Sequence, residues 1–225
     1  MRVILGLIAL VVVAYLYRQY GRRKSLSPLL PRNFDFGKRR DTLRSTLALL
    51  EERGARVLVE TGVARQGLEN TRGDGGSTIV FSLWASQNQA HLHAVDINSD
   101  NTARAAQAIE EYKLQDYVSL YVSDSIEFLK SFEEQVDLLY LDSYDYDKRN
   151  ISIQQLSQQH HLYEFQAIES RLHENTVVLI DDCNLPGGGK GKLVIDYILS
   201  RGWKIYRYKY QAILVRRQTD QAQLR

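Results

Sequence analysis

Six acidic residues stand where short apolar runs of this sequence end, and acids in that position can bind a cation or a polar ligand. A single acid after a strand is most often a helix cap or a turn former, and for Asp124 taken alone that explanation is at least as good. Acids after five such runs are harder to explain as solvation, because like charges crowded at one rim of a sheet repel one another. The six are Glu60, Asp96, Asp124, Asp142, Asp181 and Asp182.

Residues 56–77 supply a second feature with chemical meaning, a strand joined to a helix through glycines. An apolar run ends on Glu60 and continues through Gly62 and a polar loop to Ser77, which is expected to cap the next helix. Glycines let backbone approach a ligand closely, and the amino end of a helix offers unpaired N–H groups. The arrangement indicates a nucleotide-like ligand at the carboxyl edge of a sheet, although glycine-rich turns alone are common.

Two histidines and an acid lie close together near the middle of an expected helix. His160, His161 and Glu164 can reach the rim as a general base or an extra ligand, with His161 as the candidate base. A polar stretch of a surface helix explains them equally well. The glycine loop at 184–192 lacks the Ser or Thr of a Walker loop, which leaves Lys190 as a candidate anion contact.

The elements that must position these residues alternate between strand and helix. Strands are expected at 57–59, 91–97, 117–122, 136–141, 176–180, 203–210 and 212–216, and helices at 38–53, from 77, from 99 or 100, after 124, at 153–172 and at 193–199. This order predicts an α/β fold with a doubly wound, Rossmann-like, mostly parallel seven-stranded sheet covered on both faces. The last two strands are too close together for a helical crossover, so they should form an antiparallel hairpin.

Composition narrows the class of protein. The 225 residues suit one α/β domain with an appendage, and a net charge of +2 gives no case for nucleic-acid binding. The single cysteine, Cys183, excludes an intramolecular disulfide and suits a reducing compartment.

The amino terminus predicts a membrane anchor. Val3 to Tyr17 is an apolar run that spans ~22 Å as a helix, short of a ~30 Å hydrocarbon core, but flanking tyrosines can extend it. A cleaved signal peptide is the alternative, yet no small-residue cleavage site follows the run. Basic residues after it place the globular part in the cytoplasm. The expected divisions are an anchor at 1–20, a basic linker at 21–37, the main domain at 38–217 and a flexible tail at 218–225.

Over about residues 38–216 the motifs resemble those of class I S-adenosylmethionine-dependent methyltransferases. "VLVETG" looks like the family's first motif, "HAVDIN" is similar to the second, and "VSDS" resembles the adenine-binding motif. The resemblance implies that S-adenosylmethionine is the cofactor. The long loop at 63–76 departs from the family and is a candidate lid. The implied cofactor-binding residues are Glu60, Gly62, Ser77, Asp96, Asp124, Ser125 and Asp142.

"LYLDSYDYD" and "VLIDDCNLPGGGKGK" look like the metal-dependent O-methyltransferase branch, and the layout also resembles uncharacterised methyltransferase-like proteins with a DSxDxD loop. The resemblance implies that Asp142, Asp181 and Asp182 hold Mg²⁺ or a similar divalent cation, which suits an all-oxygen ligand set. Such a cation lowers the pKa of an acceptor hydroxyl, with Asp142 in a catalytic role beside it. The lysine that this branch carries near its first acid is not evident here.

The expected function is therefore that of a membrane-anchored methyltransferase, directed at oxygen and assisted by a metal. Its acceptor is a small molecule or a substrate delivered by the membrane, and the oligomeric state is left open. A nicotinamide-dependent oxidoreductase is one alternative, but it calls for a GxGxxG turn that the sequence lacks. A non-catalytic module that kept the cofactor fold is the other.

Overall fold

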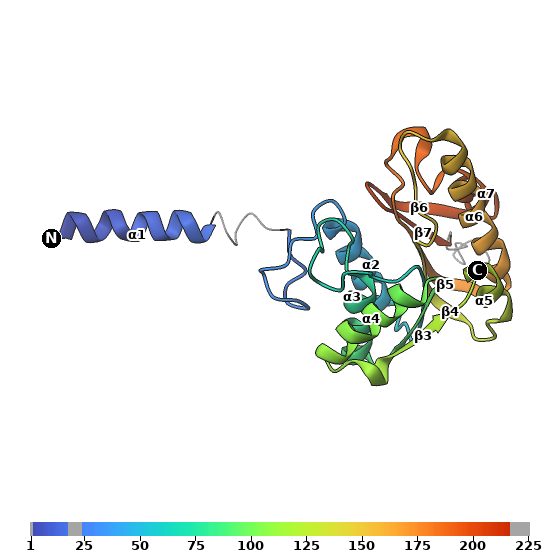
Figure 1. The fold of residues 1–225 in the computed structure, drawn as a ribbon, viewed down its shortest axis with the longest axis horizontal. Helices are drawn as coiled ribbons and strands as arrows, with labels where there is room; N and C mark the ends of the chain where they lie inside the picture. Colours follow the sequence, from blue (N-terminus) through green and yellow to red (C-terminus); the bar gives the residue numbers. More distant parts are fainter. Residues whose placement is uncertain (1, 18–23, 217–225) are drawn as a thin grey trace, which may run out of the picture.

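A seven-stranded sheet forms the centre of the chain in the computed structural model, which describes residues 2–17 and 24–216 (Figure 1). The order of strands across the sheet is β3-β2-β1-β4-β5-β7-β6. The strands are β1 (Val57–Thr61), β2 (His91–Asp96), β3 (Val118–Val122), β4 (Val136–Leu141), β5 (Leu172–Ile180), β6 (Trp203–Tyr208) and β7 (Ala212–Arg216).

The pairing of these strands confirms the predicted topology. Strands β1 to β5 run parallel to one another, and the order reverses between β1 and β4. Strand β7 runs antiparallel to both β5 and β6, so the sheet closes with the expected hairpin. A doubly wound sheet of this kind binds its ligands beyond the carboxyl ends of the strands near such a reversal.

Helices cover both faces of the sheet (Figure 1). Residues of α2, α3 and α4 share one hydrophobic core with the first face, and residues of α5, α6 and α7 share a second core with the other. The helices are α1 (Arg2–Leu16), α2 (Arg40–Glu52), α3 (Ser77–Asn88), α4 (Ser99–Glu111), α5 (Ser125–Ser131), α6 (Ile151–Ile168) and α7 (Lys192–Ser200).

Alternation along the strands explains the two cores. Leu58 of β1 and Leu138 of β4 belong to the first core, whereas their neighbours Val59 and Leu139 belong to the second. Successive side chains of a strand point to opposite faces, and both faces are covered, so the strands read as continuous apolar runs.

Several boundaries differ from the prediction, and those of α6 and β5 differ most. The helix expected at 153–172 begins at Ile151, where the Asn150 side chain accepts hydrogen bonds from the first turn, and it ends at Ile168. Strand β5 begins at Leu172 instead of residue 176, because an irregular register lets Leu172 pair with Val136.

The segment expected to be a basic linker contributes to the core. Leu26, Leu30 and Phe36 are at most 4% exposed and belong to the first hydrophobic cluster. The Phe36 N–H donates to the Lys24 carbonyl over 2.9 Å, which closes this segment into a loop. The expected linker residues 21–23 and the tail at 218–225 lie outside the described residues.

The prediction of a single-pass membrane anchor at 1–20 is wrong. Helix α1 has 15 residues, and none of the helices described for this chain is long and apolar enough to cross a membrane. At 1.5 Å per residue such a helix falls well short of a ~30 Å hydrocarbon core. The placement of the main domain on the cytoplasmic side of a membrane depended on this anchor and falls with it.

Candidate active site

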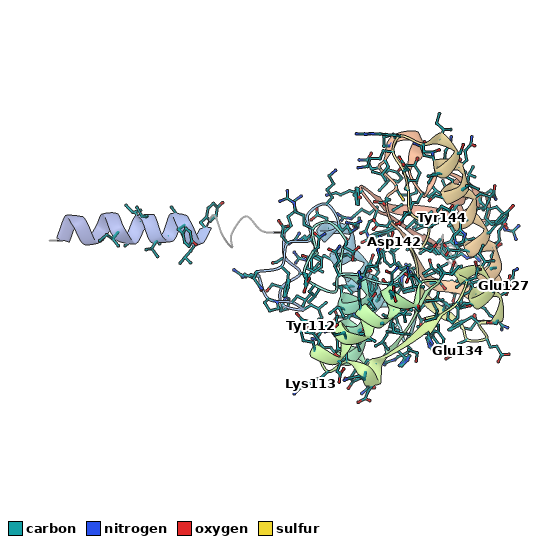
Figure 2. The ribbon with its side chains drawn as sticks, in the orientation of Figure 1. Tyr112, Lys113, Glu127, Glu134, Asp142 and Tyr144 are labelled. Carbon is teal, nitrogen blue, oxygen red and sulfur yellow. The ribbon has the colours of Figure 1, made fainter. Side chains whose placement is uncertain are left out.

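A cleft of about 550 Å³ opens at the carboxyl edge of the parallel strands. Three of the six predicted acids line it, namely Asp96 from the end of β2, Asp142 from the end of β4 and Asp182 from the end of β5. Asp142 and Tyr144 are labelled at this edge in Figure 2. The sheet therefore brings together side chains that are far apart in the sequence.

Asp96 is held in place by three N–H donors. Its Oδ1 accepts from the Asn98 backbone over 2.8 Å and from Asn101 Nδ2 over 3.3 Å, and its Oδ2 accepts from the Val63 backbone over 3.3 Å. These bonds fix a half-buried carboxylate at the wall of the cleft.

Gly62 allows the ends of β1 and β4 to meet. Its φ is +80°, and a Cβ there would lie 2.7 Å from the Asp142 carbonyl oxygen. A side chain at this position would therefore force β1 and β4 apart, and the structural need for glycine is a backbone contact within the protein.

Glu60 lies beneath the cleft instead of facing it. The side chain is fully buried, and the Ser77 hydroxyl donates to its Oε1. Burial raises the pKa of Glu60 to about 8, so the carboxyl group is protonated at neutral pH. Ser77 was expected to cap α3, but Gly76 holds the cap position and Ser77 is the first helical residue.

Lys190 fills the space between two of the expected metal ligands. Its Nζ lies 2.6 Å from Asp142 Oδ1 and 3.8 Å from Asp182 Oδ2, and the residue is 3% exposed. Burial alone would lower the pKa of Lys190, but the carboxylates of Asp142, Asp182 and Asp181 outweigh it and raise the pKa to about 12. The lysine is therefore a permanent cation at the cleft.

Arg39 forms an ion pair with Asp181, the third expected metal ligand. Its Nε donates to Asp181 Oδ2 over 2.7 Å, and its Nη2 lies 3.8 Å from Asp182 Oδ1. The Tyr140 hydroxyl lies 3.1 Å from Oδ2 of both Asp142 and Asp181, so it links the two acids. Asp181 is fully buried and has no surface at the cleft.

These contacts do not fit a metal centre built from Asp142, Asp181 and Asp182. Each carboxylate already has a lysine or arginine beside it, so the place of a divalent ion is taken by protein cations. Among residues 2–17 and 24–216, no group of three or more His, Cys, Asp or Glu side chains could hold a metal ion. Metal binding by these three acids stays a prediction that the contacts described here do not favour.

Asp124 and Ser125 do not line this cleft. Asp124 caps α5, since its side chain accepts from the backbone N–H groups of Ile126 and Glu127. The Ser125 hydroxyl lies 3.0 Å from His160 Nε2 on α6. The simpler explanation of Asp124 as a helix cap describes its contacts here.

His161 is enclosed within the packing of α6. It is fully buried, and its Nδ1 lies 2.6 Å from the Ser157 carbonyl. Burial lowers the pKa of His161 to about 4. Glu164 is also fully buried, and its Oε1 lies 3.4 Å from His160 Nε2. The placement of His161 does not support a role as general base at the rim.

Comparison with known proteins is consistent with this geometry. The chain is similar in fold to SAH-bound PaMTH1 from Podospora anserina, at 14% identity and a TM-score of 0.61 over 94% of this chain and 96% of that one. It is also similar to an O-methyltransferase from Bacillus cereus in complex with SAH, at 16% identity and a TM-score of 0.56 over 79% and 81%. Cofactor-bound Rv0187 from MTB gives 14% identity and a TM-score of 0.59 over 80% and 81%. No curated protein matches the chain.

A family model settles the assignment. Residues 72–183 match the model of a family described as a methyltransferase domain. This chain carries a methyltransferase domain. The matched region of the methyltransferase begins in the long loop after β1 and reaches the Asp181–Cys183 turn after β5, so it includes most of the cleft.

Two basic residues of the methyltransferase site were missed or underrated in the sequence. Arg39 precedes α2 and reaches Asp181 across 142 positions of sequence, so no local pattern could reveal the pair. Lys190 was recognised only as a candidate anion contact. Its position after a run of glycines could have indicated a place at the cleft, because a glycine-rich loop can fold back over the end of the preceding strand.

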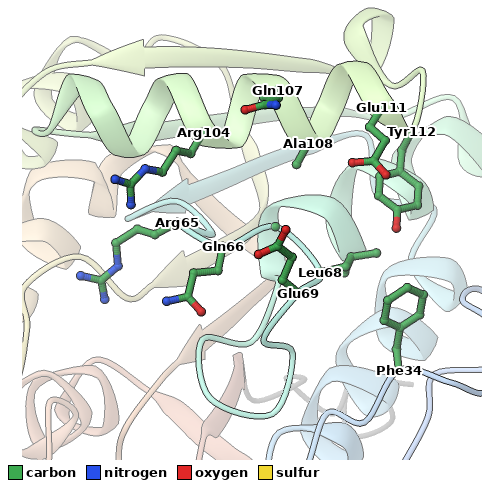
Figure 3. Close-up of a pocket in the computed structure, with 11 residues that line it drawn as sticks. Phe34, Arg65, Gln66, Leu68, Glu69, Arg104, Gln107, Ala108, Glu111 and Tyr112 are labelled. Atoms are coloured by element: carbon green, nitrogen blue, oxygen red, sulfur yellow. The ribbon is translucent and has the colours of Figure 1, made fainter.

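A second hollow of about 450 Å³ lies between the long loop and α4 of the methyltransferase. Figure 3 shows Arg65 and Arg104 at one end of it and the rings of Phe34 and Tyr112 at the other. Arg65 also lines the cleft at the sheet edge, so this side chain separates the two hollows.

Proposed function

We propose that this domain transfers a methyl group from S-adenosylmethionine to an oxygen atom of a small-molecule acceptor. The observation that carries the proposal is the single cleft lined by Asp96 and Asp142. These acids end the two strands that flank β1, so one ligand beyond β1 can touch both. The family assignment supports methyl transfer, as do the structurally similar proteins that were solved with SAH or cofactor bound.

Four of the predicted cofactor residues have a place in this proposal. The Asp96 carboxylate would accept hydrogen bonds from the two ribose hydroxyls, which are donors of the kind that a fixed carboxylate binds well. Gly62 and Ser77 line the part of the cleft next to β1, where the methionine portion would lie, and Glu60 supports it from beneath. Contacts of Asp124 and Ser125 with the adenine stay a prediction.

The reaction needs positioning and a proton acceptor more than it needs covalent help from the protein. The acceptor oxygen supplies the electron pair of the new C–O bond, and the sulfur keeps the pair of the broken C–S bond. The hydroxyl proton of the acceptor leaves to a carboxylate at the rim. Asp142 and Asp182 are the candidates, because both line the cleft.

Calorimetric titration of the protein with S-adenosylmethionine and, separately, with NADH tests this proposal. We expect binding of S-adenosylmethionine alone, and we expect Asp96→Ala to weaken it at least about tenfold, since a hydrogen bond to a charged group contributes about 1.5–3 kcal/mol. Asp116→Ala is the matched control, because Asp116 is exposed and lies outside the cleft. Binding of NADH without S-adenosylmethionine would favour an oxidoreductase instead.

A further inference from the structure

The cleft contains a charge arrangement that the family resemblance did not lead us to expect. Three carboxylates, those of Asp142, Asp181 and Asp182, lie within reach of two protein cations, Lys190 and Arg39. Two monovalent cations carry the same total charge as one divalent metal ion. The carboxylates are therefore neutralised as far by the chain itself as they would be by Mg²⁺.

Both cations are held by more than their carboxylates. Arg39 Nη1 donates to the Gly73 carbonyl over 2.8 Å, and its guanidinium lies 4.8 Å from the centre of the Tyr210 ring. The Lys190 backbone N–H donates to the Asp182 carbonyl over 3.2 Å. Both basic residues are therefore held in position by contacts other than their ion pairs with the carboxylates.

The loop before Lys190 is also packed against the acids. A Cβ on Gly189 would lie 1.8 Å from the Asp182 carbonyl oxygen, so backbone touches backbone there. Gln158 Nε2 on α6 donates to the carbonyls of Gly187 and Gly189 over 3.1 Å each. These contacts deliver the lysine to the cleft as part of the fold.

We propose that Lys190 and Arg39 take the place of a divalent cation in this methyltransferase, and that the Lys190 ammonium holds the acceptor oxygen during transfer. Both cations line the cleft, but only the Lys190 ammonium lies between Asp142 and Asp182, the two candidate proton acceptors. Arg39 is committed to Asp181 below the surface and balances that charge. The oxygen-binding role rests on the proposed function, whereas the replacement of the metal does not.

Titration of the full-length protein with MnCl₂, followed by calorimetry and by the electron paramagnetic resonance signal of free Mn²⁺, tests the replacement. We expect no Mn²⁺ binding to the wild-type protein up to millimolar concentration. We expect Lys190→Met, which leaves Asp142 and Asp182 without their shared cation, to bind Mn²⁺ at least about tenfold more tightly than the wild type. Lys192→Met is the matched control, since Lys192 is exposed and only two residues away.

Micromolar Mn²⁺ binding by the wild-type protein would overturn the inference. So would a Lys190→Met variant that melts cooperatively yet gains no Mn²⁺ binding over the wild type. If Lys190→Met does not fold, Lys190→Gln replaces it, and if neither folds the wild-type titration decides alone. S-adenosylmethionine is titrated into the same wild-type sample, and failure to bind it removes the proposed function without touching the Mn²⁺ result.

Discussion

Glu60 is a carboxyl group whose protonation depends on the fold. Its pKa is about 8 in the folded protein because of burial, against an ordinary value of 4.5. Between these values the unfolded chain releases a proton that the folded chain keeps, so the stability of the folded protein falls as pH rises. This contribution is complete below about pH 4.5 and is lost as the pH passes 8.

We expect Glu60→Gln to remove that dependence, because an amide does not titrate. Relative to the wild type, the free energy of unfolding of the variant should rise between pH 5 and pH 8. The rise is at most ~1.4 kcal/mol for each unit by which folding shifts the pKa of Glu60 within this range. Urea unfolding at a series of pH values measures it. Glu51→Gln, at an exposed position of α2, is the control. An unchanged difference between variant and wild type across this range would show that Glu60 is ionised in the folded state.

The acidic residues were predictable as a set, but their individual partners were not. Asp96, Asp142 and Asp182 were expected at one rim because strand ends share an edge, and they do line one cleft. Asp181 was expected beside them and is buried against Arg39 instead, since adjacent side chains at a strand end point to opposite sides. Sequence spacing predicts the edge of the sheet at which an acidic residue lies. The ion-pair partner of that residue depends on which segment packs against it in the fold.

At the scale of the elements, the glycine loop before α7 fixes the position of Lys190. We expect Gly189→Ala to destabilise the protein by more than Gly54→Ala, because Gly189 has a φ of +61° and a close backbone neighbour, whereas Gly54 has a φ of +64° and open space. Positive φ alone costs roughly 1 kcal/mol for alanine, and the clash with the Asp182 carbonyl adds to it. Thermal unfolding of both variants measures the difference. Equal losses would mean that the loop can shift without cost.

The long loop at 63–76 is tied across the cleft by Arg65. Its guanidinium contacts Asp145 Oδ1 at 3.2 Å and Asp74 Oδ1 at 3.7 Å, joining the loop to the segment after β4. Arg65 and Asp145 are well exposed, so we expect Arg65→Ala to cost less than about 1 kcal/mol of stability. The same change should speed hydrogen exchange of the loop backbone, as measured by mass spectrometry.

Arg72→Ala is the control for this loop, because Arg72 is exposed on the same segment. Exchange that is unchanged in Arg65→Ala would show that the loop is held by its buried residues, such as Leu68, and not by the ion pairs.

The order and type of the elements were predictable because most strands are apolar runs and helices such as α2 and α4 have apolar periodicity. The residues at which the elements begin and end were less predictable. The first turn of α4 is capped by Asn98 instead of Ser99 or Asp100, and the start of β5 depends on a register irregularity against β4. Such ends are decided by side-chain geometry and by neighbouring strands, neither of which a single stretch of sequence contains.

At the scale of the whole molecule, we propose that the folding unit begins near residue 24 and not at 38. A chain that starts at residue 24 should melt at the same temperature as the full chain. A chain that starts at 38 should lose roughly 5 kcal/mol, because it lacks three large buried side chains that contribute about 1.5–3 kcal/mol each. Those side chains are Leu26, Leu30 and Phe36. Identical melting of the two shortened chains would contradict this boundary.

The loop that carries Lys190 also has a consequence for how this protein can diverge. Residues 187–191 pack on the Asp182 backbone, reach α6 and place a charge in the cleft, so one replacement there alters several features together. Selection for a new acceptor would therefore leave this loop alone and act on the exposed segment that follows β4. Tyr144 and Asp145 are exposed there. Among natural variants we expect few changes at 187–191 and many at 143–149, with acceptor preference following the latter.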